Sequence, residues 1–552
     1  MINPAELELL QQALATLAKG YDDLPAFTPD FDIEAASTVL QVVAERMQDN
    51  YPYYHPQYAG QMLKPPHAIA RIAYAMSLWV NPNNHALDGG KASSALEKEC
   101  IIEIGQMYGW ESPLGHLTGG GTMANLEALW VAGRLHPGKR IIASRQAHYT
   151  HSRISQVLGL PFSPVPVRHD GRMDLEAIEA LLKEGDVGTV VATMGNTGLG
   201  AVDSLPEILE LADKYDVRVH ADAAYGGYFG LASELRDETK AAFDSLSDVD
   251  SIVVDPHKHG LQPYGCGCVL FRNPDVGHFY KHGSPYTYFS SAELHLGEIS
   301  LECSRPGASA VALWATQQMF PLQQCGQLAA WLDLGLLAAR DFWTRLNNSD
   351  NYQPLMEPEL DIVIYALAGA GAREVSEKAR RVFALAAQKD LHLAMIELPV
   401  DLVCTYLPQL EADADTVTCL RSVLMKPEHK DWLDRIMAIL EECGLLQAQC
   451  PRQNEAQVKT GESADHRRHQ VGEGIQDLAP LQHRMQFHDQ SGKRRKTAAK
   501  TDGEQQAVLI RDDTGFVKPR CTCHQFGDDT HGKAAEQIRA QSAPWKCNVS
   551  LQ

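Results

Sequence analysis

The sequence predicts an α/β fold in which helices cover both faces of a mostly parallel sheet. Three observations predict this fold. Between about residues 100 and 275, short apolar runs alternate with segments of helical periodicity. Polar and charged side chains directly follow several of the apolar runs. The segment LPEILELADKY has the single apolar face of a crossover helix that packs on a sheet, formed by Leu205, Ile208, Leu209 and Ala212.

The apolar runs of this region are short and rich in β-branched residues, as buried strands are. We expect five strands: Arg140–Ser144, Thr189–Thr193, Val217–Ala221, Ser251–Asp255 and a run that begins at Gly267.

The 552 residues exceed one ordinary domain, and composition divides them into four parts. Residues 1–60 are expected to form an N-terminal helical segment, with Leu7, Leu10, Leu14 and Leu17 on one face of its first helix. Residues 61–319 form the large domain and residues 320–450 a smaller C-terminal α/β domain, which contains the runs LDIVIYAL and TVTCLRSVLM. Residues 451–552 are polar and without sustained periodicity, which predicts a tail of low order.

Charge and composition limit the classes of partner. The formal net charge of −21 disfavours nucleic acid and anionic membranes, so a small molecule is the expected partner. No export signal and no membrane-spanning run are visible, and the scattered cysteines suit reduced thiols, so we expect a cytoplasmic protein. The CTCH run at 521–524 matches no standard zinc spacing, and no metal is expected.

The residues after each expected strand form the candidate site, because ligands of such sheets bind outside the carboxyl ends of the strands. Lys258 and His257 follow one strand, Asp222 a second, His148 a third and Thr197 a fourth. A lone lysine here would be only a surface charge. The accompanying histidines and aspartate favour a reactive site.

The segment LTGGGTMANLEALWVAGR at 117–134 adds a candidate phosphate site. Gly120, Gly121 and Thr122 lead into a helix whose free N–H groups and dipole attract a phosphate. By itself, the same pattern also suits an ordinary glycine-rich turn.

Asp222 ends an apolar strand, where a carboxylate is costly unless a cation is bound against it. A protonated ring nitrogen would serve as that cation. The small Ala224 would leave room for a flat ring, and the imidazole of His148 could stack on the opposite face of the ring.

In this order along the chain, four motifs resemble the group II pyridoxal-phosphate-dependent decarboxylases. The motifs are TGGGTMANL at 118–126, QAHYT at 146–150, HADAAYGG at 220–227 and DPHKHGLQPYGCG at 255–267. The similarity extends from about His55 to about Glu441. It implies the aspartate-aminotransferase-like (fold type I) fold, pyridoxal 5'-phosphate (PLP) as the cofactor, and removal of carbon dioxide from an L-amino acid.

The resemblance also implies a role for each matched residue. Lys258 matches the lysine that attaches PLP, and Asp222 matches the partner of its ring nitrogen. Ala224 lies under the ring, His148 stacks on it and acts in catalysis, and Thr197 lies near its phenolic oxygen. The residues that match the phosphate site are Gly120, Gly121, Thr122 and His257.

Further expectations concern the substrate. The segment Lys281–Leu296 resembles the mobile loop that carries a proton donor in relatives, with Tyr286 and Tyr288 as candidates and Tyr264 as a third. The residues expected to line the substrate pocket are His55, Asn84, His85 and Tyr264. The family shares its sites between two subunits, so the resemblance implies a homodimer.

Two questions stay open at the level of sequence. The run HKHGLQPYGCG resembles glutamate decarboxylases and SRPGASAVALWA resembles bacterial tyrosine decarboxylases, so an acidic and an aromatic substrate both remain. The scarcity of arginine in the expected pocket loops mildly favours the aromatic one. A PLP-dependent aminotransferase or carbon–carbon lyase is the alternative enzyme, and a non-catalytic protein that retains the fold is the third reading.

Overall fold

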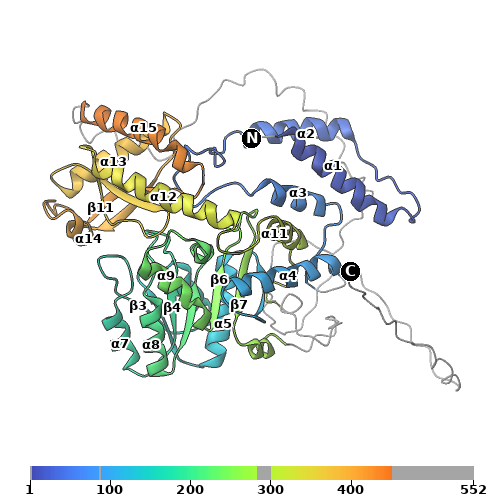
Figure 1. The fold of residues 1–552 in the computed structure, drawn as a ribbon, viewed down its shortest axis with the longest axis horizontal. Helices are drawn as coiled ribbons and strands as arrows, with labels where there is room; N and C mark the ends of the chain where they lie inside the picture. Colours follow the sequence, from blue (N-terminus) through green and yellow to red (C-terminus); the bar gives the residue numbers. More distant parts are fainter. Residues whose placement is uncertain (1–2, 86–88, 282–299, 450–552) are drawn as a thin grey trace, which may run out of the picture. The chain divides into compact units, whose positions relative to one another are not determined.

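The structure is a computed structural model that describes residues 3–85, 89–281 and 300–449 (Figure 1). The chain divides into two units, Met1–Asn454 and Glu455–Gln552, and all described residues belong to the first. Tyr286, Tyr288 and the expected tail therefore lie outside the described residues.

The larger sheet has seven strands in the order β1-β7-β6-β5-β4-β2-β3. Neighbouring strands from β6 to β3 are parallel, and β7 runs antiparallel to both β6 and β1. The expectation of a mostly parallel sheet is confirmed. All five predicted strands are present, and β1 and β3 are additional. The strands are β1 (Leu114–Thr118), β2 (Arg140–Ser144), β3 (Phe162–Val165), β4 (Val187–Thr193), β5 (Arg218–Asp222), β6 (Ser251–Val254) and β7 (Gly267–Phe271).

Helices cover both faces of this sheet (Figure 1). Alternate residues of one strand point to opposite faces, so Val190 packs in the cluster that contains Ile208 of α8, whereas Val191 packs against Leu129 of α5. The helices are α4 (Lys91–Met107), α5 (Gly121–Leu135), α6 (Thr150–Leu158), α7 (Leu175–Leu182), α8 (Leu205–Tyr215), α9 (Asp237–Asp244) and α11 (Gly307–Met319). Short 3-10 turns are η1 (Lys19–Tyr21), η3 (Gly227–Leu231), η4 (Ser245–Asp248) and η5 (Pro274–Phe279).

A second, antiparallel sheet of four strands follows, in the order β10-β11-β9-β8. Its β9 and β11 fall within the two apolar runs expected for the C-terminal part. The elements are α12 (Gln327–Asn347), β8 (Tyr352–Pro354), β9 (Ile362–Leu367), α13 (Ala372–Ala387), β10 (Ala394–Pro399), α14 (Val400–Tyr406), β11 (Thr416–Val423) and α15 (His429–Gln449).

The N-terminal part consists of α1 (Pro4–Ala18), α2 (Ile33–Met47) and α3 (Ala68–Ser77). Pro4 stands at the first position of α1, and Asn3 and Asp32 cap α1 and α2 with their side chains. Glu6 of α1 forms an ion pair with Arg71 of α3, with 2.7 Å between Oε2 and Nη2. Neither α1 nor α2 has a buried residue. Within the described ranges, no helix combines the length and the apolar character needed to cross a bilayer.

Candidate active site

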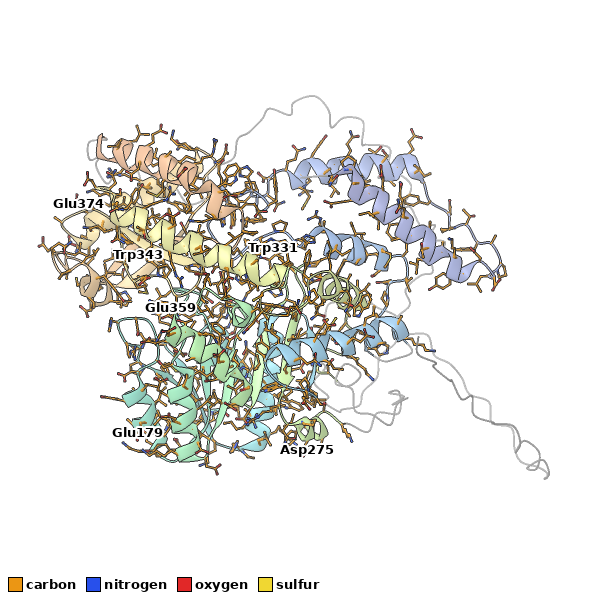
Figure 2. The ribbon with its side chains drawn as sticks, viewed as in Figure 1. Glu179, Asp275, Trp331, Trp343, Glu359 and Glu374 are labelled. Carbon is orange, nitrogen blue, oxygen red and sulfur yellow. The ribbon has the colours of Figure 1, made fainter. Side chains whose placement is uncertain are left out.

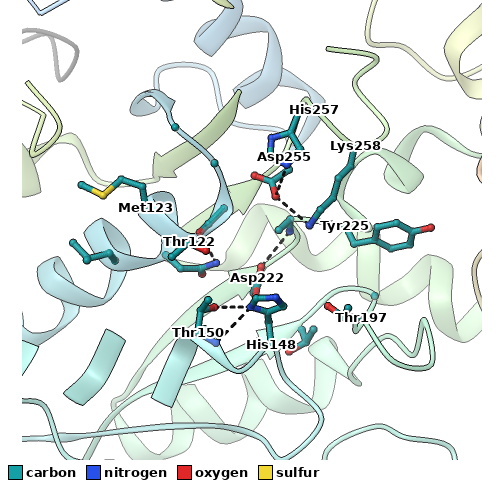
Figure 3. A pocket seen from close by; sticks show the side chains of 18 of the residues that line it. Thr122, Met123, His148, Thr150, Thr197, Asp222, Tyr225, Asp255, His257 and Lys258 are labelled. Carbon is teal, nitrogen blue, oxygen red and sulfur yellow. Dashed lines mark hydrogen bonds and ion pairs between the residues drawn. The ribbon is translucent and has the colours of Figure 1, made fainter. Parts of the chain in front are cut away.

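A cavity of about 420 Å³ lies at the carboxyl ends of β4, β5 and β6 and at the start of α5 (Figure 3). This is the edge of the sheet where the strand-end residues were expected to meet. The structure brings all nine predicted cofactor residues to its wall. They are Gly120, Gly121, Thr122, His148, Thr197, Asp222, Ala224, His257 and Lys258.

The start of α5 forms one end of the cavity and fits a phosphate. Gly120 has φ +144° and ψ 173°, a conformation open essentially only to glycine. A Cβ on Gly267 would lie 2.5 Å from the carbonyl carbon of Gly120, so the adjacent strand also requires glycine there. Among the described residues, no side chain caps α5, which leaves the first N–H groups of the helix available to an anion.

Two side chains flank this helix start. The Nδ1 of His257 lies 2.8 Å from the carbonyl oxygen of Cys266, which orients the ring, and burial lowers the pKa of His257. Glu302 accepts a hydrogen bond of 2.8 Å from the N–H of Gly119 and also lines the cavity. A phosphate at the helix start would compete with this half-buried carboxylate, because the two anions repel each other.

Asp222 is buried at the end of β5, where its carboxylate contacts His151 and the backbone. The Nε2 of His151 lies 2.7 Å from Asp222 Oδ2, and the N–H of Ala224 donates to Oδ1 at 3.2 Å. Burial alone would raise the pKa of Asp222, but the hydrogen bond and charge of His151, with the charges of His220 and Lys258, hold it below its ordinary value. The carboxylate is therefore kept ionised and suits a protonated ring nitrogen.

Lys258 follows β6 and points into the cavity beside Asp255 (Figure 3). Its Nζ lies 3.1 Å from Oδ2 of Asp255, whose side chain is 4% exposed. The other oxygen of Asp255 has no hydrogen-bond partner among the described residues. Asp255 therefore holds the lysine amine with one oxygen, and its other oxygen can accept a further hydrogen bond.

His148 and Thr197 line the cavity wall near Asp222 (Figure 3). Nδ1 of His148 lies 2.8 Å from the hydroxyl of Thr150, and burial lowers the pKa of His148, which favours a neutral ring for stacking. The carbonyl of Thr197 accepts a hydrogen bond of 2.6 Å from the buried guanidinium of Arg421.

Sequence reasoning missed three residues of this site. His151 stands three residues after His148, and that spacing is its only signal in the sequence. Asp255 belongs to the DPHK motif, but its position at the end of an apolar run predicts a strand residue and no role in the site. Arg421 lies on β11 of the second sheet, so its contact with Thr197 depends on tertiary structure.

The four residues expected to line the substrate pocket do not line the cavity of this chain. Asn84 is buried, and its side chain bonds Glu97 and Ser93. His55 packs on Trp432, with ring centroids 4.8 Å apart. Tyr264 is exposed, and its ring centroid lies 5.1 Å from that of His257.

His85 is half-buried, and its Nδ1 has no hydrogen-bond partner in the described part of the chain. A role for these four side chains in substrate binding therefore stays a prediction that depends on a second subunit.

The fold and the cavity together define a PLP-binding enzyme of the α/β class, with a phosphate cradle, an ionised aspartate for the ring nitrogen and a lysine between them. Residues 135–367 match the family model described as the pyridoxal-dependent decarboxylase conserved domain. A probable L-tyrosine/L-aspartate decarboxylase of Methanothermobacter thermautotrophicus is 32% identical over 325 residues, covering 58% of this chain and 85% of that protein. The chain belongs to the pyridoxal-dependent decarboxylase family, which confirms the resemblance.

Two further comparisons agree. The L-aspartate/L-glutamate decarboxylase of Pyrococcus horikoshii is 27% identical over 330 residues, covering 59% of this chain and 84% of that protein. The crystal structure of mouse CSAD in its apo form has a TM-score of 0.64 and 19% identity, covering 80% of this chain and 99% of that one. The likeness to the structure of mouse CSAD confirms the fold.

Proposed function

We propose that this chain binds PLP through Lys258 and releases carbon dioxide from an L-amino acid, leaving the corresponding amine. The observation that carries the proposal is the convergence of Lys258, Asp222, His148 and the start of α5 on one cavity. When bound, PLP supplies an electron sink for the electron pair that remains when carbon dioxide departs.

The chain's own residues would hold and polarise that group. The N–H groups at the start of α5, with Thr122 and His257, would bind the phosphate. Asp222, kept ionised by His151, would hold a proton on the ring nitrogen and so maintain the electron sink. His148 would cover one face of the ring and help exclude water.

Departure of carbon dioxide needs the substrate carboxylate held out of the plane of the ring, and we propose Arg421 as its anchor. Its guanidinium is buried beside the cavity wall, where it donates to the carbonyls of Thr197 and Gly198. Nη1 also lies 3.3 Å from Oε1 of Gln61. A guanidinium with an amide neighbour suits a carboxylate better than a neutral group.

For the substrate, we propose an aromatic or an acidic L-amino acid. The relatives described above carry names that include tyrosine, aspartate and glutamate. Loss of carbon dioxide must be followed by protonation of the substrate's α-carbon, and Tyr286 and Tyr288 remain the proposed donors.

We further propose a cytoplasmic homodimer. The N-terminal helices α1 and α2 have no buried residue and expose a set of apolar side chains, which a second copy would cover. The set comprises Leu7, Leu9, Ile33, Val39, Leu40, Val42, Val43 and Met47. Free buried thiols such as those of Cys100 and Cys266 suit a reducing compartment.

The test is carbon dioxide release from tyrosine, aspartate and glutamate, with PLP added, by the wild type and Lys258→Ala. We expect release from one of the three and none from the variant. Lys139→Ala, a surface change away from the cavity, is the matched control and should keep full activity. An unchanged rate in Lys258→Ala would refute the assignment of the lysine. A wild type that binds PLP but transfers an amino group without releasing gas would refute the decarboxylase.

A further inference from the structure

A second cavity, of about 310 Å³, lies between α3, α12 and the segment that links β11 to α15. Its lining shares no residue with the cavity that holds Lys258. Apolar side chains form one wall, and Trp331, near the start of α12, is among them (Figure 2). The apolar wall comprises Phe229, Leu261, Leu328, Trp331, Leu332 and Met425.

Two buried polar side chains that also line the cavity have unused hydrogen-bonding capacity. His259 is 2% exposed and Asp361 is fully buried. Nε2 of His259 and Oδ2 of Asp361 lie 3.4 Å apart, and neither atom has a hydrogen-bond partner among the described residues. The two atoms are within ion-pair distance of each other but form no hydrogen bond among the described residues, so part of their hydrogen-bonding capacity stays unused at the cavity wall.

Two lysines, Lys64 and Lys426, line the cavity. The ammonium of Lys426 donates to the carbonyl of Tyr58 at 2.7 Å, and that of Lys64 donates to the carbonyl of Met425 at 3.3 Å. Within the described ranges, neither lysine has a carboxylate within ion-pair distance. The ammonium of Lys426 also lies 5.2 Å from the centroid of the Tyr58 ring. Carbonyl and ring contacts are weaker partners for an ammonium than a carboxylate, so both lysines keep capacity for an anion.

Two carboxylates, Asp361 and Glu428, also line the cavity and act on these lysines. Arg71 also lines the cavity but is paired with Glu6. Glu428 is an exposed lining residue, and His67 stacks on the ring of Trp331. Asp361 is the one buried carboxylate on the described wall, and its other oxygen accepts a hydrogen bond from Tyr225.

We propose that this cavity binds a small organic monocarboxylate with an aromatic body, the carboxylate between Lys64 and Lys426 and the ring against Trp331. The size fits, because cavities of roughly 300 Å³ and above hold small organic ligands. The proposal goes beyond decarboxylation and does not depend on it, since neither lysine lines the cavity around Lys258.

Charge supports the same ligand. Burial lowers the pKa of Lys64 to about 8, and burial together with the charge of Lys64 lowers that of Lys426 to about 7. The charges of Asp361 and Glu428 act in the opposite direction on the pKa of Lys64, and that of Glu428 does so for Lys426. Because both ammoniums must be protonated to attract a carboxylate, affinity should fall as the pH rises through these values.

The experiment is isothermal titration of the full chain with phenylacetate as the probe, with and without PLP. We expect one site per chain and quenching of the fluorescence of Trp331, absent from Trp331→Phe. Lys426→Met should weaken binding at least about tenfold, because a charge-assisted hydrogen bond is lost. Lys430→Met, four residues further along and paired with Asp341 outside the cavity, is the matched control and should bind like the wild type.

Ala68→Trp provides a second test of the site that does not depend on the folding of Lys426→Met. Ala68 is half-buried at the first position of α3 and lines the cavity, so an indole there should block the probe without removing a charge. No heat at millimolar probe would overturn the proposal. So would binding that Lys258→Ala abolishes while Ala68→Trp leaves it intact, because the probe would then occupy the cavity around Lys258.

Discussion

The contact between His151 and Asp222 gives the most specific prediction about the active site. His151→Phe removes the hydrogen bond of 2.7 Å to the buried carboxylate. Among the described residues, the N–H of Ala224, at 3.2 Å, is then the one remaining hydrogen-bond donor to that carboxylate. A hydrogen bond to a charged group contributes roughly 1.5–3 kcal/mol. Because the bound cofactor's ring nitrogen needs an ionised Asp222, we expect the affinity for PLP to fall roughly 10- to 100-fold.

The pH dependence follows from the sign of the pKa shift. The folded-state pKa of Asp222 is held below its ordinary value, so the stability it contributes is present above the unfolded pKa of about 3.9 and is lost as the pH falls through the folded value. Without His151 the folded pKa rises, and PLP binding should weaken at a higher pH than in the wild type.

The assay is a titration of the apoprotein with PLP, followed by visible absorbance at several pH values. His151→Gln, whose amide can donate near the position of Nε2, should recover most of the affinity, whereas a merely structural role would not distinguish it from phenylalanine. Ser152→Ala, on the exposed face of the same helix, is the control. Wild-type affinity and pH dependence in His151→Phe would refute the reasoning.

Three further predictions concern the glycine at the helix start, the carboxylate anchor and the second cavity. Gly120→Ala should lower the free energy of unfolding by about 1–3 kcal/mol, because φ +144° is strained for alanine. Chemical denaturation measures this loss, and the control Gly20→Ala, at an exposed glycine, should show no comparable loss. Arg421→Met should raise KM for the amino acid well above any change in the dissociation constant of PLP, and equal effects on both would contradict a role in carboxylate binding. The folded pKa of Lys426, about 7, is below its unfolded value, so its contribution to stability is present above about pH 10.4 and is lost as the pH falls toward 7. As the pH is lowered from about 10 to about 7, thermal melts should therefore show the stability of Lys426→Met rising relative to that of the wild type. A stability difference that does not change with pH would contradict the buried charge.

The sequence predicted the strands and site residues whose signals are local. Lys258 and Asp222 each follow an apolar strand, and parallel strands place their carboxyl ends at one edge, so their meeting needed no tertiary information. Two strands were missed for physical reasons. β1 (LGHLT) contains glycine and histidine in place of a β-branched run, and β3 is an edge strand that contains Pro164.

The contacts that join distant segments were not predictable in this way. Arg421 reaches Thr197 from another sheet, and Asp361 of the second cavity is bonded to Tyr225 of the first. Neither pair has a spacing or motif that marks it, because each contact arises only when the two sheets pack together. The contact between His151 and Asp222 was equally unpredictable from the sequence, because the two residues lie on different elements.

The attachment of PLP to Lys258 is tested most directly by chemical trapping. The PLP-loaded chain is reduced with borohydride, which fixes a link between the cofactor and a lysine amine, and is then digested and mapped by mass spectrometry. We predict that the added mass lies on Lys258 and that free L-amino acid, supplied before reduction, lowers its yield. Labelling of another lysine, or no labelling of a chain that releases carbon dioxide, would contradict the proposed site.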